Sequence, residues 1–115
     1  MISKIILGIL AAIVVFVLYQ KLTAVRISGA DARALVADGA MLVDVRSTGE
    51  FSGGHIEGAL NIPIQELSGR IGELGDKSGQ IVLYCQSGSR SAMAKRLLEK
   101  NGFTDVHDMG GMSHW

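Results

Sequence analysis

The feature that most constrains this chain of 115 residues is an uncharged apolar segment close to its amino terminus. The segment Ile5–Gln20 separates Lys4 from Lys21 and consists almost entirely of Ile, Leu, Val, Ala and Phe. As a helix rising about 1.5 Å per residue it is about 24 Å long, slightly short of a hydrocarbon core of about 30 Å. Snorkelling of the two lysines, with Tyr19 at the interface, makes up the difference. Because the segment lacks the polar stripe of a helix packed on a globular core, it predicts one transmembrane helix.

We therefore divide the chain into a membrane anchor at residues 1–26, with its helix over about residues 5–20, and a domain at residues 27–115. A cleaved signal peptide is the alternative, because a basic start and an apolar stretch fit that pattern too. Its cleavage site would follow Leu22-Thr23-Ala24, where the bulky leucine occupies a position that prefers a small residue. A retained anchor fits better.

The basic residues around the helix bear on its orientation. Lys21, Arg26 and Arg33 follow it, whereas only Lys4 and the terminal amine precede it. The positive-inside rule therefore favours a single-pass protein with a cytoplasmic domain, by a margin of about one charge. Cleavage would instead leave an exported, periplasmic domain.

Helix pairing is a separate question. Gly8 and Ala12 have a small-xxx-small spacing that permits homo- or hetero-association of membrane helices. In a helix this rich in small residues, chance explains the spacing better.

The net charge of zero conceals two unlike pieces. Residues 1–26 carry three basic groups and no acidic one, whereas residues 27–115 carry 8 basic and 11 acidic groups. This balance gives no electrostatic footprint for a nucleic-acid partner. The single cysteine forms no disulfide within the chain, so the fold rests on its apolar core.

Residues 27–115 alternate between strand and helix patterns. We predict strands in the segments 41–45, 80–84 and 105–107, and a turn at Gly110-Gly111. We predict helices over 29–38 with Ser28 as the N-cap, after Pro63 on the spacing of its apolar residues, and over 90–101. Strands separated by helices indicate a parallel sheet covered on both faces, hence an α/β fold.

The most informative stretch is the loop from Cys85 to Arg90, which follows a predicted buried strand and leads into a helix. Small residues with a glycine allow successive backbone N–H groups to converge on one point, and the helix dipole adds positive potential. These conditions lower the pKa of a cysteine and make its thiolate nucleophilic. Arg90 adds a fixed charge at the rim. A lone buried cysteine without function is the alternative, and Ser91 reads best as a turn or capping residue.

In combination with several motifs elsewhere, this loop resembles the active site of single-domain rhodaneses. The resemblance spans essentially all of residues 27–115. The motifs that carry it occur in this order: Asp44-Val45-Arg46, Glu50-Phe51, Gly54-His55-Ile56, Gly58-Ala59, Asn61-Ile62-Pro63, Cys85 to Arg90, Gly102-Phe103, and Gly110-Gly111 through Trp115.

The resemblance implies a five-stranded parallel sheet flanked by helices on both faces, here preceded by one transmembrane helix. It also implies sulfur transfer, in which Cys85 becomes a persulfide and Arg90 is its electrostatic partner. The donor would be thiosulfate or a persulfide, and the acceptor cyanide or a thiol. The backbone of Gln86, Ser87, Gly88 and Ser89 would bind the substrate. The six-residue loop has the length of sulfurtransferases and is one residue shorter than that of phosphatase-like relatives.

Four further residues, Asp44, Arg46, Glu50 and His55, are implied as the framework of the site rather than as its chemistry. No metal or cofactor is expected, since the histidines have no ligand spacing with each other or with the cysteine. One difference from the family bears on the donor. Thiosulfate-specialised relatives often carry basic residues directly after the cysteine, whereas this chain has the neutral residues Gln86 and Ser87 there. We therefore expect thiosulfate to be a poor donor. The competing hypothesis is a membrane-tethered docking module of the same fold with little catalysis.

Overall fold

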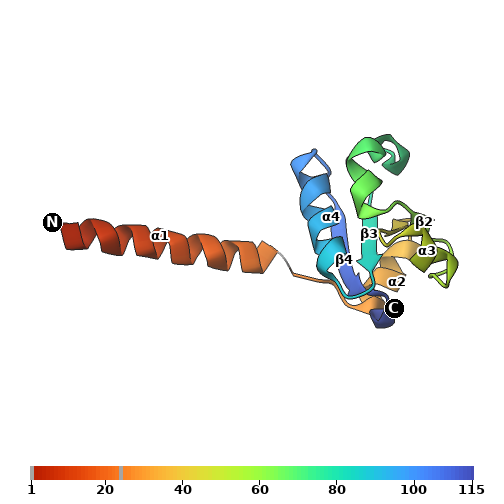
Figure 1. Ribbon diagram of the computed structural model, residues 1–115, viewed down its shortest axis with the longest axis horizontal. Coiled ribbons are helices and arrows are strands. Elements are labelled where there is room, and N and C mark those ends of the chain that lie inside the picture. Colours follow the sequence, from red (N-terminus) through yellow and green to blue (C-terminus); the bar gives the residue numbers. More distant parts are fainter. Residues whose placement is uncertain (1, 24) are drawn as a thin grey trace.

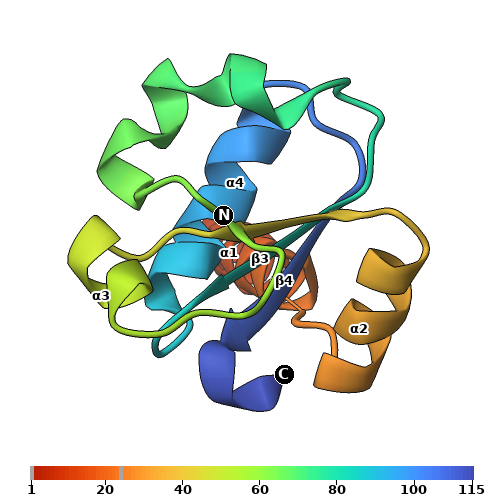
Figure 2. The ribbon, with the colours of Figure 1, turned by 90° about the vertical axis from the view of Figure 1, so that its right-hand side faces the viewer.

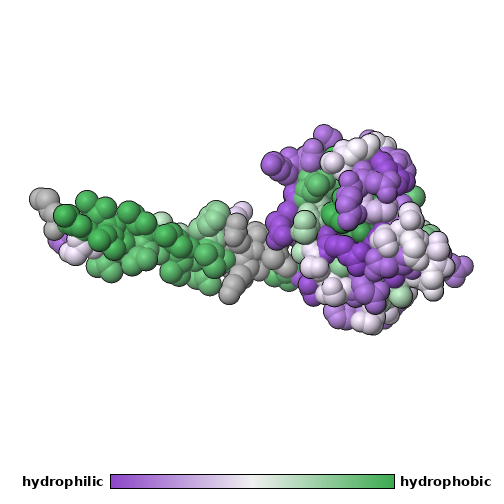
Figure 3. Space-filling model, viewed as in Figure 1, coloured by the Kyte–Doolittle hydropathy of each residue, from purple (hydrophilic) through white to green (hydrophobic). Residues whose placement is uncertain are grey.

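The structure, a computed structural model, describes residues 2–23 and 25–115. Its first element is the long helix α1 (Ile2–Thr23), which extends away from the globular part of the chain (Figure 1). The window Ile2–Tyr19 has a mean hydropathy of 2.6, and none of it is buried. Figure 3 shows this helix as an apolar rod beside a domain whose visible surface is mostly hydrophilic. Such a helix is long and apolar enough to cross a membrane, and a signal sequence can have the same length and composition.

The helix is longer than the predicted one over about residues 5–20, since it begins at Ile2 and ends at Thr23. Two details of the prediction lie outside the described part of the chain. They are the side chain of Lys21 and residue Ala24 at the alternative cleavage site.

A parallel sheet forms the centre of the domain. Its strands are β1 (Met41–Asp44), β2 (Leu60–Asn61), β3 (Ile81–Cys85) and β4 (Val106–Gly111), in the spatial order β2-β1-β3-β4. The α/β prediction is confirmed. The strand count of five was wrong for the described residues, which form four strands.

One further segment contacts the edge of the sheet without adding a strand. Residues 25–28 belong to neither a helix nor a strand, and the Ile27 N–H in this segment donates to the Asp108 carbonyl of the edge strand β4 at 2.9 Å. A single backbone hydrogen bond does not make a ladder, so this segment is not a strand.

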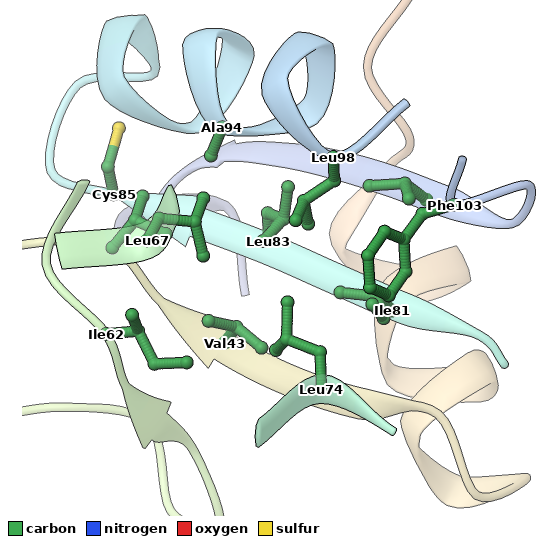
Figure 4. Close-up of a cluster of buried hydrophobic side chains, with 12 residues drawn as sticks. Val43, Ile62, Leu67, Leu74, Ile81, Leu83, Cys85, Ala94, Leu98 and Phe103 are labelled. Atoms are coloured by element: carbon green, nitrogen blue, oxygen red, sulfur yellow. The ribbon is translucent and has the colours of Figure 1, made fainter. Parts of the chain in front are cut away.

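Apolar side chains cover both faces of the sheet in two clusters. One cluster packs under α4 (Ser89–Lys100) and the 3₁₀ helices η1 (Ile64–Gly69) and η2 (Ile71–Leu74). The other packs under α2 (Gly29–Ala37) and η3 (Met112–His114). Figure 2 shows α4 and α2 on opposite sides of the strands. In Figure 4, Ala94 and Leu98 of α4 point down onto Leu83 of β3.

The local structure departs from the sequence pattern in two places. The apolar spacing after Pro63 predicted one helix, but η1 and η2 are separate 3₁₀ turns, because Gly69 and Gly72 disfavour a continuous α-helix. The predicted turn at Gly110-Gly111 is instead the end of β4, where Gly110 has a φ of +82° beside a register shift. The short helix α3 (Thr48–Ser52) was not predicted at all, and it begins with a capping box between Ser47 and Glu50.

Candidate active site

Cys85 is the last residue of β3, and its side chain is completely buried. The chain then turns through residues 86–88 and enters α4, whose N-cap is Gly88 with a φ of +105°. This left-handed conformation, which favours glycine, directs the Gly88 N–H at Cys85 Sγ over 2.9 Å. Figure 4 shows the cysteine at the end of β3, next to the loop that leads into α4. The sulfur therefore lies at the carboxyl edge of a parallel sheet, where open α/β sheets bind their ligands.

Ser91, in the first turn of α4, brings a polar side chain to the sulfur of Cys85. Its buried hydroxyl lies 3.5 Å from Cys85 Sγ and donates to the Gly88 carbonyl at 3.1 Å. A hydroxyl can rotate, so the same group is able to donate to the sulfur once the thiol ionises. Sequence reasoning had assigned Ser91 a capping or turn role and missed this contact. The available signal was its position one turn into the helix, directly after the loop.

The surroundings of Cys85 lower the pKa of its thiol. Burial is the largest influence and acts in the opposite direction, since it disfavours the charged form. The hydrogen bond with the Ser91 hydroxyl and those from the backbone N–H groups of Ser91, Gly88 and Arg90 together outweigh burial. The loop therefore favours a thiolate held by neutral hydrogen-bond donors.

Arg90 forms a bidentate ion pair with Glu50 of α3. Its Nη1 lies 2.6 Å from Glu50 Oε1, and its Nη2 lies 3.0 Å from Oε2. The Arg90 side chain, assisted by hydrogen bonds from Ser47, lowers the pKa of Glu50 to about 2. Both side chains are about one-third exposed, so the pair lies at the rim of the site rather than on its floor. The charge of Arg90 is therefore already matched by a carboxylate.

Asp44 and Arg46, at the end of β1, form a second ion pair that is fully buried. Arg46 Nη2 lies 2.8 Å from Asp44 Oδ2, and the hydrogen bond with Asp44 raises the pKa of Arg46. The same guanidinium donates to the Gly54 carbonyl at 2.7 Å and to Gln86 Oε1 at 3.2 Å. Through these contacts the pair connects the end of α3 to the cysteine loop.

The remaining predicted residues lie at the surface. Gln86, Ser87 and Ser89 are exposed, and of these only the side chain of Gln86 reaches a framework residue. His55 stacks on Phe51, with ring centroids 3.6 Å apart, and its Nδ1 lies 2.8 Å from the Phe51 carbonyl. Because a carbonyl only accepts, Nδ1 carries the proton. His55 thus packs against α3 through Phe51.

Arg26 is a residue that sequence reasoning treated only as a charge flanking the membrane. Its guanidinium packs against Gly88 of the cysteine loop, where an added Cβ would lie 2.2 Å from Arg26 Nη2. Arg26 Nε also lies 3.9 Å from Oδ2 of the buried Asp108. No local sequence motif predicts this contact, because it joins residues 62 positions apart that the fold brings together.

A buried cysteine at the carboxyl edge of a parallel sheet, with a lowered thiol pKa and a backbone N–H directed at its sulfur, defines the class of domain to which this structure belongs. The sequence matches the rhodanese-like domain family over residues 28–115. This chain belongs to that family, as the motif order had indicated.

Several known proteins are similar to the domain. It is 46% identical over 78 residues to the uncharacterised YqhL of Bacillus subtilis, covering 66% of this chain and 60% of YqhL. It is 37% identical over 71 residues to the thiosulfate sulfurtransferase PspE of Escherichia coli, covering 61% of this chain and 68% of PspE. The structure of the human single-domain sulfurtransferase TSTD1 superposes with a TM-score of 0.67 at 30% identity, covering 78% of this chain and 90% of TSTD1. Sulfurtransferases are therefore among its homologues.

Proposed function

We propose that this protein is a membrane-anchored sulfurtransferase that carries a sulfane sulfur as a persulfide on Cys85. The Cys85 thiolate attacks the outer sulfur of a donor, and a new S–S bond forms at Sγ. The donor's own S–S bond breaks, so that its electron pair leaves with sulfite when the donor is thiosulfate, or with a thiolate when it is a persulfide. A nucleophilic acceptor, cyanide or a thiolate, then attacks the outer sulfur, and Cys85 departs as a thiolate.

The observation that carries this proposal is the donation of the Gly88 N–H to Cys85 Sγ at 2.9 Å within a buried loop. The same N–H groups that stabilise a thiolate stabilise the anionic persulfide that replaces it. The lowered pKa of Cys85 supports the first step, because the thiolate and not the thiol is the nucleophile. Membership of the rhodanese-like family and the named activities of PspE and TSTD1 support the same chemistry.

We further propose that the donor is a persulfide on a protein or small thiol, rather than thiosulfate. Gln86 and Ser87 supply no charge for a sulfonate, and Arg90 is occupied by Glu50 in the resting site. The loss of a charge-assisted hydrogen bond to the donor costs about 1.5–3 kcal/mol of binding free energy. A persulfide donor makes no such demand, because its reactive sulfur is small and its leaving group is an ordinary thiolate.

The domain arrangement is part of the proposal: residues 1–26 anchor a rhodanese domain at residues 27–115, on the cytoplasmic side. The exposed apolar window Ile2–Tyr19 supports an anchor, and the excess of basic residues after it supports the orientation. Protease treatment of intact and permeabilised cells tests the orientation. Digestion of the domain from the outer face of intact cells would contradict it and favour an exported domain.

Intact mass spectrometry tests the chemistry. Incubation of the full chain with a persulfide donor should add one sulfur atom, and cyanide should remove it. Cys85→Ser is the control, and we expect it to remain unmodified under the same conditions. If the wild type takes up no sulfur from any donor, or if the serine variant is loaded equally well, the sulfurtransferase proposal is wrong and the docking-module alternative gains support.

A further inference from the structure

The residues that join α1 to the domain lie directly on the cysteine loop. α1 ends at Thr23, and Arg26 packs its guanidinium against Gly88 and its aliphatic stem against Gly110. An added Cβ would lie 2.2 Å from Arg26 Nη2 at Gly88 and 2.9 Å from Arg26 Cδ at Gly110. Because the Gly88 N–H donates to Cys85 Sγ at 2.9 Å, a single residue separates this linker from the reactive sulfur.

The linker is held in place by more than one contact. Ile27 N donates to the carbonyl of Asp108 at 2.9 Å, and the buried Asp108 carboxylate lies 3.9 Å from Arg26 Nε. The other oxygen of this carboxylate accepts from the Gly110 N–H at 2.8 Å. Backbone and charge contacts therefore fix the linker to the end of β4 that adjoins the cysteine loop.

Covalent geometry then limits how far the site can lie from the end of α1. Three peptide steps join Thr23 to Arg26, and a fully extended chain spans at most about 3.6 Å per residue, hence about 11 Å. The four helical residues after Tyr19 add about 6 Å at 1.5 Å per residue. The α-carbon of Arg26 thus lies at most about 17 Å beyond the apolar window. A headgroup layer about 5–8 Å thick takes up part of this distance, so Arg26 lies close to the outer edge of that layer. If the helix crosses a bilayer, the cysteine loop lies at the membrane surface.

On this basis, which rests on the proposed function, we infer that Cys85 exchanges sulfur with a thiol carried by a molecule embedded in the bilayer. The thiolate of that molecule attacks the outer sulfur of the Cys85 persulfide, and a new S–S bond forms between them. The bond to Sγ breaks, its electron pair returns to Cys85 as a thiolate, and no external oxidant or reductant is needed. The short linker raises the effective concentration of such a group at the loop and gives no advantage to a freely diffusing thiol.

The test uses the full chain reconstituted in phosphatidylcholine vesicles and loaded with sulfur from a persulfide donor. Two acceptors are compared: hexadecanethiol within the bilayer and glutathione in the aqueous phase. A flexible insertion of about 12 Gly/Ser residues between Ala24 and Val25 lengthens the linker about fivefold. The matched control places the same insertion between Lys77 and Ser78, an exposed turn at the opposite end of β3 from Cys85.

Effective concentration falls with about the −3/2 power of linker length, so the linker insertion should slow transfer to hexadecanethiol about tenfold. Transfer to glutathione and the extent of loading should stay unchanged, and the control insertion should change neither. If the linker insertion slows both acceptors equally, or neither, the inference is overturned while successful loading leaves the sulfurtransferase proposal intact. Failure of the wild type to load at all would overturn both.

Discussion

Replacement of Ser91 by alanine isolates the contribution of one hydroxyl to the reactivity of Cys85. The hydroxyl lies 3.5 Å from Sγ in a buried position, and its loss removes a donor to the thiolate and the hydrogen bond to the Gly88 carbonyl, while the backbone N–H groups that face the sulfur remain. We therefore expect Ser91→Ala to raise the pKa of Cys85, because burial would then be opposed by the backbone N–H groups alone. Since serine and alanine are nearly the same size, the core should be little disturbed.

The magnitude follows from the strength of a hydrogen bond to a charged group, about 1.5–3 kcal/mol. Below the pKa of the thiol, this loss reduces the thiolate fraction about 10- to 150-fold, at about 1.4 kcal/mol per factor of ten. A more basic thiolate is also a stronger nucleophile, and a Brønsted slope of about 0.4–0.5 recovers nearly half of that loss on a logarithmic scale. The net expectation is a decrease of about 3- to 15-fold in the alkylation rate.

The assay is iodoacetamide alkylation of the only cysteine in the chain, followed by intact mass over about pH 5 to 9. The two rates should cross as the pH rises, and above the pKa of both thiols the variant should be alkylated faster, because both thiols are then ionised and its thiolate is the more basic. Ser89→Ala, an exposed serine two residues earlier in the same helix, is the matched control and should alkylate like the wild type. Equal rates for Ser91→Ala and wild type at every pH would refute the assigned role, as would an equal slowing by Ser89→Ala.

Three further variants probe the rest of the site. Glu50→Gln should free Arg90 and lower the KM for thiosulfate with kcat unchanged. Because the pKa of Glu50 is lowered from 4.5 to about 2, its contribution to stability is complete above 4.5 and is lost as the pH falls toward 2. The difference in urea stability between wild type and this variant should shrink across that window. Asp44→Ala leaves the buried Arg46 without its partner and should cost about 3–5 kcal/mol in urea unfolding. Gly88→Ala forces a side chain into a φ of +105° and should abolish sulfur loading, with about 1–3 kcal/mol of stability lost on thermal denaturation.

The parts of the site that were predicted from the sequence are those formed by residues that follow one another in the chain. The apolar run before Cys85 predicted a buried strand, and the pattern after it predicted a helix; β3 ends at Cys85, and α4 begins at Ser89. The left-handed Gly88 between them follows from the need for a tight turn at that junction. Local pattern was sufficient here because strand, loop and helix are consecutive in the chain.

The parts that were missed depend on distant contacts or on competing local geometries. The bidentate ion pair of Arg90 with Glu50 joins α4 to α3 across 40 positions, and the sequence around neither residue predicts which partner it pairs with. Arg26 looked like a membrane-flanking charge because its other partner, Gly88, has no side chain to suggest a contact. The segment after Pro63 has the three-residue spacing that α and 3₁₀ helices share, so its apolar pattern could not separate the two.

The three arginines around the loop, taken together, argue for the kind of sulfur this site handles. Arg26 faces Asp108, Arg46 faces Asp44 and Arg90 faces Glu50, at N–O distances of 3.9, 2.8 and 2.6 Å. Each positive charge is thus balanced by a carboxylate, and the hydrogen bonds to the sulfur come from backbone N–H groups and one hydroxyl. Such donors stabilise a small, singly charged thiolate or persulfide. A doubly charged donor such as thiosulfate would have to displace a carboxylate first, which supports the proposal of a persulfide donor and is the reason why Glu50→Gln should improve the use of thiosulfate.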